Sequence, residues 1–176
     1  MQSERANLAV NLVGPGFSKR LLGFTDDSIH AIMLQMADIV VIDTSVFVAA
    51  LKSPDGAARQ VLRLCLNRDL TPIMGQKLFL EFLDVLGRPR LFDSSPANPA
   101  DRQALFHGFL SVSRWFSVFF LWRPNLPDEG ENHVLELAVA RSAVAVITHN
   151  VSDFAGDLKF PGLQILTPGQ FLRSKR

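Results

Sequence analysis

Five acidic residues could together form one metal-binding centre: Asp43, Glu81, Asp128, Glu131 and Asp153. Carboxylates gathered at close range repel one another, and a hard divalent cation relieves that repulsion. Mg²⁺ and Mn²⁺ take oxygen ligands and commonly keep several waters. Such a centre can activate water for phosphodiester hydrolysis. The sequence contains no competing Cys–His pairing, glycine-rich phosphate loop or Gly-x-Ser-x-Gly turn.

The placement of Asp43 has two interpretations. It follows Ile39-Val40-Val41-Ile42, a continuous apolar run typical of a strand buried on both faces of a parallel sheet. Ligands of open α/β sheets bind beyond the carboxyl ends of such strands. Alternatively, Asp43 or Ser45 merely caps the helix that follows. The residues of this stretch favour neither interpretation.

The other acidic residues also have structural alternatives. Asp128 with Glu131, and Asn150 with Asp153, have the spacing of a helix capping box. By helical angle Glu81 points away from the apolar face of its own predicted helix, as a solvated glutamate would. That face consists of Phe79, Phe82, Leu83 and Leu86.

Strands and helices are expected to alternate along the chain. Apolar runs predict strands at about 38–43, 70–74, 118–121, 144–148 and 163–166. Helical spacing and turn residues predict helices at about 45–52, 58–66, 76–86, 101–117, 129–141 and 168–172. This order implies βαβ units and a parallel sheet covered on both faces.

Length and composition indicate one ordinary globular domain. The chain has 176 residues, of which 48% are hydrophobic, as in ordinary soluble domains. Its net charge is only +1, so the overall charge does not indicate a nucleic-acid partner. A single cysteine, Cys65, excludes disulfides within the chain. No apolar stretch has membrane-spanning length and no signal peptide is evident, so we expect a cytoplasmic protein without a membrane partner. Residues 1–35 form an extension of unknown role before a domain at 36–176.

Five segments, in order, carry a family resemblance: Val41–Val46, Leu80–Pro89, Asp128–Ala138, Thr148–Phe154 and Ile165–Leu172. This pattern resembles the PIN-domain metal-dependent ribonucleases, including the toxins of VapBC-like toxin–antitoxin pairs. The match runs from about Ala37 to Leu172. It implies a three-layer α/β/α sandwich around a five-stranded, mostly parallel sheet, which agrees with the strand count.

The resemblance also implies roles for the polar residues. Asp43, Glu81 and the Asp128/Glu131 pair would form the acidic pocket for Mg²⁺ or Mn²⁺, with Asp153 as a further acid. Three polar residues would line that pocket: Ser45, Thr148 and Asn150. The sequence departs from the family at Glu131, where Asp is usual, and at Asn150, where many members have Asp.

The resemblance implies an endoribonuclease that acts as a toxin and is held by a cognate antitoxin. Arg88 could contact phosphates of the RNA substrate, or simply belong to a basic turn that ends a helix. The many aromatic residues between Phe106 and Trp122 suit a core, a homodimer or antitoxin interface, or RNA stacking. The rival interpretation is a non-catalytic RNA- or protein-binding module. A phosphatase with an Asp nucleophile is disfavoured because Ser45 stands where that chemistry usually needs a second Asp.

Overall fold

Five strands form one sheet in the order β3-β2-β1-β4-β5, and every adjacent pair is parallel. The computed structural model describes residues 37–117, 129–154 and 160–175. The strands are β1 (Asp38–Ile42), β2 (Leu70–Met74), β3 (Arg114–Trp115), β4 (Ala145–Ile147) and β5 (Gln164–Leu166). The five-stranded parallel sheet expected from the sequence is therefore confirmed. The predicted extension at 1–35 and the predicted strand at 118–121 lie outside the described residues.

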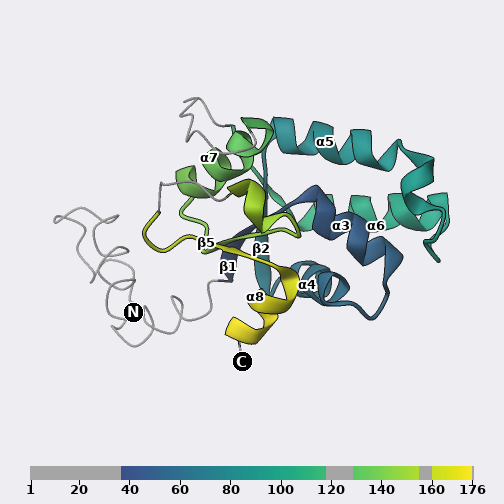
Figure 1. The fold of residues 1–176 in the computed structure, drawn as a ribbon, viewed down its shortest axis with the longest axis horizontal. Helices are drawn as coiled ribbons and strands as arrows, with labels where there is room; N and C mark the ends of the chain where they lie inside the picture. Colours follow the sequence, from purple (N-terminus) through teal and green to yellow (C-terminus); the bar gives the residue numbers. More distant parts are fainter. Residues whose placement is uncertain (1–36, 118–128, 155–159, 176) are drawn as a thin grey trace, which may run out of the picture. The chain divides into compact units, whose positions relative to one another are not determined.

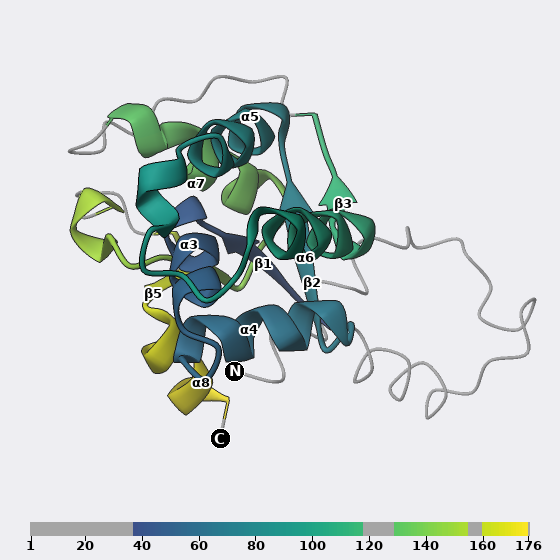
Figure 2. The same ribbon diagram turned by 90° about the vertical axis from the view of Figure 1, so that its right-hand side faces the viewer.

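Helices cover both faces of the sheet (Figure 1). Those in the described residues are α3 (Thr44–Lys52), α4 (Ala57–Leu66), α5 (Gln76–Leu86), α6 (Pro99–Val112), α7 (Asn132–Ala140) and α8 (Pro168–Ser174). Helix α7 contacts β1, β2 and β4, whereas α4 contacts β2 and also packs on α6 and α8. Figure 2 shows α4 and α8 on the opposite side of β1 and β2 from α7. This is the predicted three-layer α/β/α sandwich.

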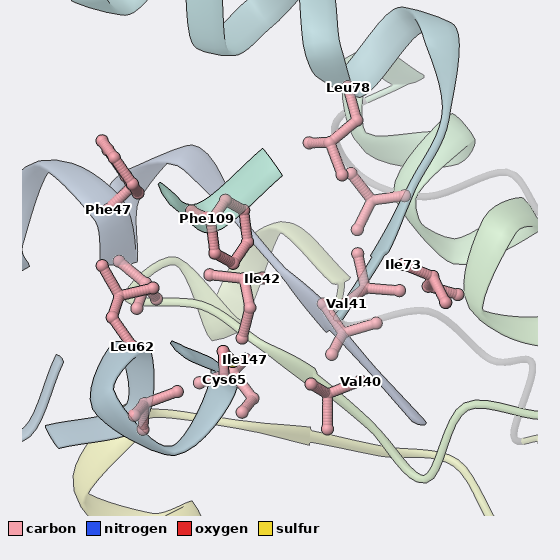
Figure 3. Close-up of a cluster of buried hydrophobic side chains, with 14 of the residues drawn as sticks. Val40, Val41, Ile42, Phe47, Leu62, Cys65, Ile73, Leu78, Phe109 and Ile147 are labelled. Carbon is pink, nitrogen blue, oxygen red and sulfur yellow. The ribbon is translucent and has the colours of Figure 1, made fainter. Parts of the chain in front are cut away.

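The central strand β1 is buried because its side chains are apolar on both faces. Val40, Val41 and Ile42 are each at most 1% exposed, as expected for a strand covered by helices on two sides. Figure 3 shows these residues among buried side chains from β2, β4 and the surrounding helices. Burial also raises the pKa of the Cys65 thiol, on α4, to about 12.

An aromatic cluster packs α3, α5 and α6 together. The Phe47 ring lies 5.3 Å from Phe82 and 5.8 Å from both Phe106 and Phe109, measured between ring centroids. Phe106 and Phe109 are therefore core residues rather than interface or RNA-stacking residues. Trp115 is different, because half of its surface is exposed.

Two details of the sequence prediction are wrong. Helix α6 ends at Val112, so the predicted helix at 101–117 is too long. Arg114 and Trp115 instead pair with Ile73 and Met74 of β2. Aromatic residues such as Trp115 and Phe116 are common in strands, so they do not by themselves indicate that a helix continues. Leu83, predicted to be in the apolar face of α5, is 46% exposed.

The direction of chain progression reverses at β1, between β2 on one side and β4 on the other. Strands to one side of β1 come from the middle of the chain, and those to the other side from its end. Such a switch point opens a crevice at the carboxyl ends of the strands, where α/β folds bind ligands. Asp43 directly follows β1, and Thr148 directly follows β4.

Candidate active site

Asp43 is buried at the end of β1, with only 3% of its surface exposed. Its backbone occupies the N-cap position of α3, yet its side chain makes no capping hydrogen bond. Instead, Oδ2 accepts hydrogen bonds from Ser45 Oγ at 2.5 Å and from Thr148 Oγ1 at 2.7 Å. Oδ1 accepts a longer one from Thr44 Oγ1 at 3.3 Å. The side-chain capping interpretation is therefore wrong for both Asp43 and Ser45.

The hydroxyl groups that hold Asp43 are themselves held by the backbone after β4. Ser45 Oγ accepts a hydrogen bond from His149 N at 3.1 Å, and Thr148 Oγ1 accepts one from Asn150 N at 2.9 Å. Each hydroxyl thus has its proton directed at the carboxylate and its lone pair directed at an amide. A buried charge is tolerated only when hydrogen-bonded in this way. The network fixes the orientation of Asp43 across the junction of β1 and β4.

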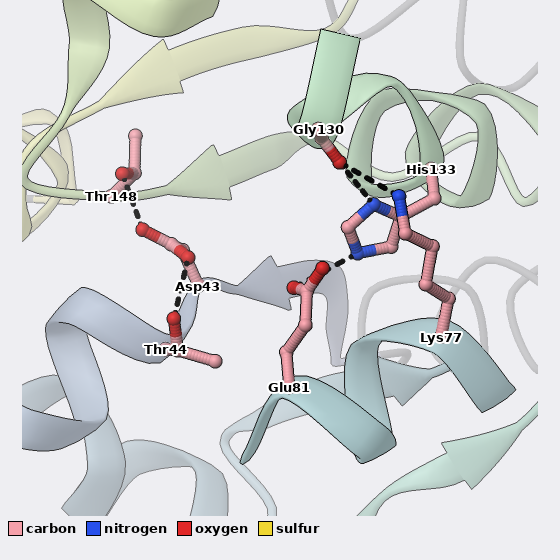
Figure 4. Close-up of polar contacts among 7 residues, drawn as sticks. All are labelled: Asp43, Thr44, Lys77, Glu81, Gly130, His133 and Thr148. Atoms are coloured by element: carbon pink, nitrogen blue, oxygen red, sulfur yellow. Dashed lines mark hydrogen bonds and ion pairs between the residues drawn. The ribbon is translucent and has the colours of Figure 1, made fainter. Parts of the chain in front are cut away.

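Glu81 projects from α5 toward the start of α7 (Figure 4). Its Oε2 lies 3.1 Å from Nε2 of His133, which is within ion-pair distance although it does not meet hydrogen-bond geometry. Nδ1 of the same ring lies 2.7 Å from the Gly130 carbonyl oxygen. Lys77 Nζ donates to that oxygen at 3.0 Å. Glu81 is therefore engaged by α7 rather than by solvent alone.

Two of the remaining predicted acids lie in short 3-10 helices, and the third is not described. Glu131 is the last residue of η3 (Glu129–Glu131) and the N-cap of α7, without a side-chain capping bond. Asp153 lies in the short 3-10 helix η4 (Val151–Phe154), and its amide donates to the Asn150 carbonyl at 3.1 Å. Asp128 lies outside the described residues.

Arg88 pairs with Asp84, which is not one of the predicted pocket acids. Its guanidinium forms an ion pair with Asp84, one turn earlier, and both side chains are 60% exposed. Pairs at this spacing on an exposed helix end contribute little to stability. An exposed, weakly held guanidinium remains available to a phosphate.

The donor groups at this edge of the sheet suit a hard cation. Asp43, Glu81 and Glu131 supply carboxylate oxygens, the ligand type that Mg²⁺ and Mn²⁺ prefer. Within residues 37–117, 129–154 and 160–175, however, no three acidic, His or Cys side chains are grouped closely enough to hold a metal. The described residues therefore include ligands of the right type for this cation, but they do not form a complete metal site.

Two histidines that the sequence left without a role contact the predicted site. His133 contacts Glu81 and the Gly130 carbonyl, and the His149 amide donates to Ser45. His133 stands two residues after Glu131, so its position near an acidic segment was visible in the sequence. The sequence did not show that its partner would be Glu81 on α5, which is 52 positions earlier.

A shallow groove of about 400 Å³ begins beside Asp43. Its lining residues are Thr44, Ser45, Val48, Ala49, Lys52, Val85, Leu91 and His149. Four of these eight residues have apolar side chains. Lys52 is the last residue of α3, and the His149 amide donates to Ser45. A groove of this size is within the range of small-ligand sites.

No helix in the described segments is both long enough and apolar enough to cross a bilayer.

Comparisons with known proteins agree with this architecture. A family model for the PIN domain matches residues 39–152, well over half of the chain. No curated protein matches significantly. Among solved structures, a chain of the VapBC2 complex from Rickettsia felis, crystallised with a DNA fragment from its promoter, superposes with a TM-score of 0.50. That match has 16% identity and covers 72% of this chain and 96% of the other, so it shows a shared fold. The chain belongs to the PIN domain family.

Proposed function

We propose that this protein is a metal-dependent endoribonuclease that hydrolyses phosphodiester bonds of cytoplasmic RNA, and that it acts as the toxin of a toxin–antitoxin pair. The observation that carries the proposal is the Asp43 carboxylate, buried at the switch point of the sheet. It is oriented by Ser45 and Thr148 rather than used to cap α3. Membership of the PIN family makes nuclease chemistry the natural use of such a carboxylate.

The proposed cation is Mg²⁺ or Mn²⁺, held by Asp43, Glu81, Asp128, Glu131 and Asp153. When bound, it would supply an activated water and stabilise negative charge on the phosphate. The protein's part is to hold the ligands in a fixed arrangement before the cation and RNA arrive. The two short hydrogen bonds to Oδ2 of Asp43 serve that purpose, because a hydrogen-bonded ligand carboxylate cannot rotate freely.

The RNA strand is proposed to leave the acidic pocket along the groove beside α3. Apolar walls formed by Val48 and Leu91 can pack against a base, while the Lys52 ammonium can meet a phosphate. Ser45, Thr148 and Asn150 would line the pocket, and Arg88 would contact a more distant phosphate. Asn150, Lys52 and Arg88 would supply donors or cations to the anionic backbone, while Ser45 and Thr148 would hold the Asp43 carboxylate in place.

A cognate antitoxin and a second copy of the chain are the proposed protein partners. The structural relative from Rickettsia felis was crystallised as VapBC2 with promoter DNA, which supports a partner of the antitoxin class for this chain. Leu80, Leu83 and Trp115 are large apolar residues that are each about half exposed. Exposed apolar residues of this kind suit a protein interface, and the proposed interfaces are with the antitoxin and with a second copy of the chain.

The deciding experiment compares RNA cleavage by the wild type with cleavage by Asp43→Asn in Mn²⁺. The substitution keeps the size of the side chain and removes its charge. Loss of a residue that only supports a metal ligand lowers activity by up to about 100-fold. We therefore expect the loss of a ligand's own charge to lower the cleavage rate by at least about 100-fold. Asp93→Asn is the matched control, because Asp93 is exposed and is not one of the predicted metal ligands. Equal cleavage by wild type and Asp43→Asn would refute the proposed chemistry.

One observation favours a second candidate, a non-catalytic module that binds RNA or protein. The described residues contain no complete group of three metal-ligating side chains. RNA binding that persists without any divalent-metal-dependent cleavage, in the wild type as in Asp43→Asn, would support this candidate over the nuclease.

A further inference from the structure

We propose that His133 is a positioning residue that fixes Glu81 for the active site; this inference rests on the proposed function for the use of Glu81. Glu81 is a long side chain on α5, and 35% of it is exposed. A glutamate in that situation normally samples several rotamers, which would weaken it as a ligand. His133 is the neighbouring side chain that limits this freedom.

The imidazole of His133 lies between two acceptors. Nδ1 faces the Gly130 carbonyl at 2.7 Å, and Nε2 faces Glu81 Oε2 at 3.1 Å. Only 12% of the His133 side chain is exposed, so its neighbours hold the ring in place. The ring therefore acts as a rigid spacer between the start of α7 and the carboxylate on α5.

Lys77 adds a second connection between the same two elements. It precedes Glu81 by four residues, so both side chains lie on one face of α5. Its Nζ donates to the Gly130 carbonyl oxygen, the acceptor that His133 also contacts. Figure 4 shows Lys77 and His133 converging on this carbonyl group, with the Glu81 carboxylate at the other nitrogen of the His133 ring. The two connections join α5 to α7, and the one through His133 reaches the Glu81 carboxylate.

Two substitutions separate the two contacts of the ring. In His133→Gln the side-chain amide can reach the place of Nε2 and keep a polar contact with Glu81. In His133→Asn the shorter amide can replace only Nδ1 and its contact with Gly130. We expect His133→Ala and His133→Asn to weaken Mn²⁺ binding, measured by calorimetry, about tenfold or more. His133→Gln should restore most of the affinity.

The variant His107→Ala is the control, because His107 is an exposed histidine on α6. It should bind Mn²⁺ as the wild type does. Each variant is first checked for an unchanged circular dichroism spectrum and thermal midpoint within a few degrees. Wild-type affinity in His133→Asn, or no recovery in His133→Gln, would overturn the positioning role.

A double-mutant cycle without metal tests the link itself. His133→Ala, Glu81→Ala and the double variant are compared by their urea midpoints in chelator. If the two side chains interact, the double variant should lose clearly less than the sum of the single losses. Strictly additive losses would refute the link. If the wild type does not bind Mn²⁺, the proposed function is contradicted. The double-mutant cycle does not depend on metal, so it would still test whether His133 and Glu81 interact.

Discussion

Thr148 donates a 2.7 Å hydrogen bond from Oγ1 to Oδ2 of Asp43, across 105 positions of sequence. Both residues are almost completely buried, with exposed fractions of 0% and 3%. The bond joins the ends of β1 and β4 at the point where the sheet reverses its order. It makes Asp43 part of a tertiary network rather than a local feature of α3.

Replacing Thr148 by Val should destabilise the protein and slow RNA cleavage. The change keeps the shape of the side chain but removes one of the hydroxyl donors to a buried carboxylate. A hydrogen bond to a charged group contributes about 1.5–3 kcal/mol, and a loss in that range is expected in urea denaturation. Thr148→Ser, which retains the hydroxyl, should recover most of the stability and cleavage. Equal stability of Thr148→Val and wild type would contradict the role given to this bond.

Adding Mn²⁺ should raise the thermal midpoint of the wild type. A ligand that binds only the native state adds about 2.7 kcal/mol at 100 times its dissociation constant. For a domain of this size that amounts to a rise of several degrees. Asp43→Asn should show little of this rise, whereas the surface control Asp93→Asn should show all of it. If Mn²⁺ does not change the thermal midpoint of the wild type, the result would argue against a metal centre. Scanning calorimetry measures each case.

Lys52→Ala should weaken RNA binding without changing which sequence is bound. A lysine that neutralises one phosphate of a single strand adds about 0.7 to the slope of log affinity against log salt concentration. Fluorescence anisotropy with a labelled RNA strand, on the Asp43→Asn background to prevent cleavage, measures that slope. Arg173→Ala, on the exposed side of α8, serves as the control. If Lys52→Ala and Arg173→Ala reduce the slope by the same amount, the groove beside α3 is not the path of the RNA.

Phe47→Ala should cost about 3–5 kcal/mol of unfolding free energy, as large-to-small changes of buried aromatic residues do. Phe47 is 1% exposed and contacts three other aromatic rings, so the cavity cannot close without moving α5 and α6. Trp115→Ala should cost clearly less, because half of that side chain is already in water. Chemical denaturation of both variants gives the comparison, and a larger loss for Trp115→Ala would contradict the assigned core.

The Cys65 thiol should resist alkylation in the native protein at pH 8. Burial raises its pKa to about 12 from an ordinary value near 9, and the thiolate is the reactive form. Because the folded state keeps the proton that the unfolded state loses, the stability due to this shift is complete below about pH 9. It declines as the pH rises from there toward 12. Cys65 is the only cysteine, so labelling by iodoacetamide with and without urea reports on this residue alone.

Much of the fold could be predicted from short-range patterns. Helix α5 occupies residues 76–86 as predicted, because a periodic apolar pattern is bounded by Gly75 and Gly87. The buried strand β1 was equally clear from its β-branched run. The end of α6 was not predictable, because Trp115 and Phe116 suit a helix face and a sheet edge alike. Pairing with β2 decided that they extend the sheet.

The sequence by itself determined which residues could do chemistry, because residue types and their positions after strands are local properties. It did not determine what Asp43 does. Capping and ligand binding require the same residue type at the same junction. The Asp43 side chain does not cap α3, and its Oδ2 instead accepts a hydrogen bond from Thr148, which follows β4. Only tertiary structure brought Thr148 to Asp43 and His133 to Glu81, because each contact depends on how the elements pack across the sheet.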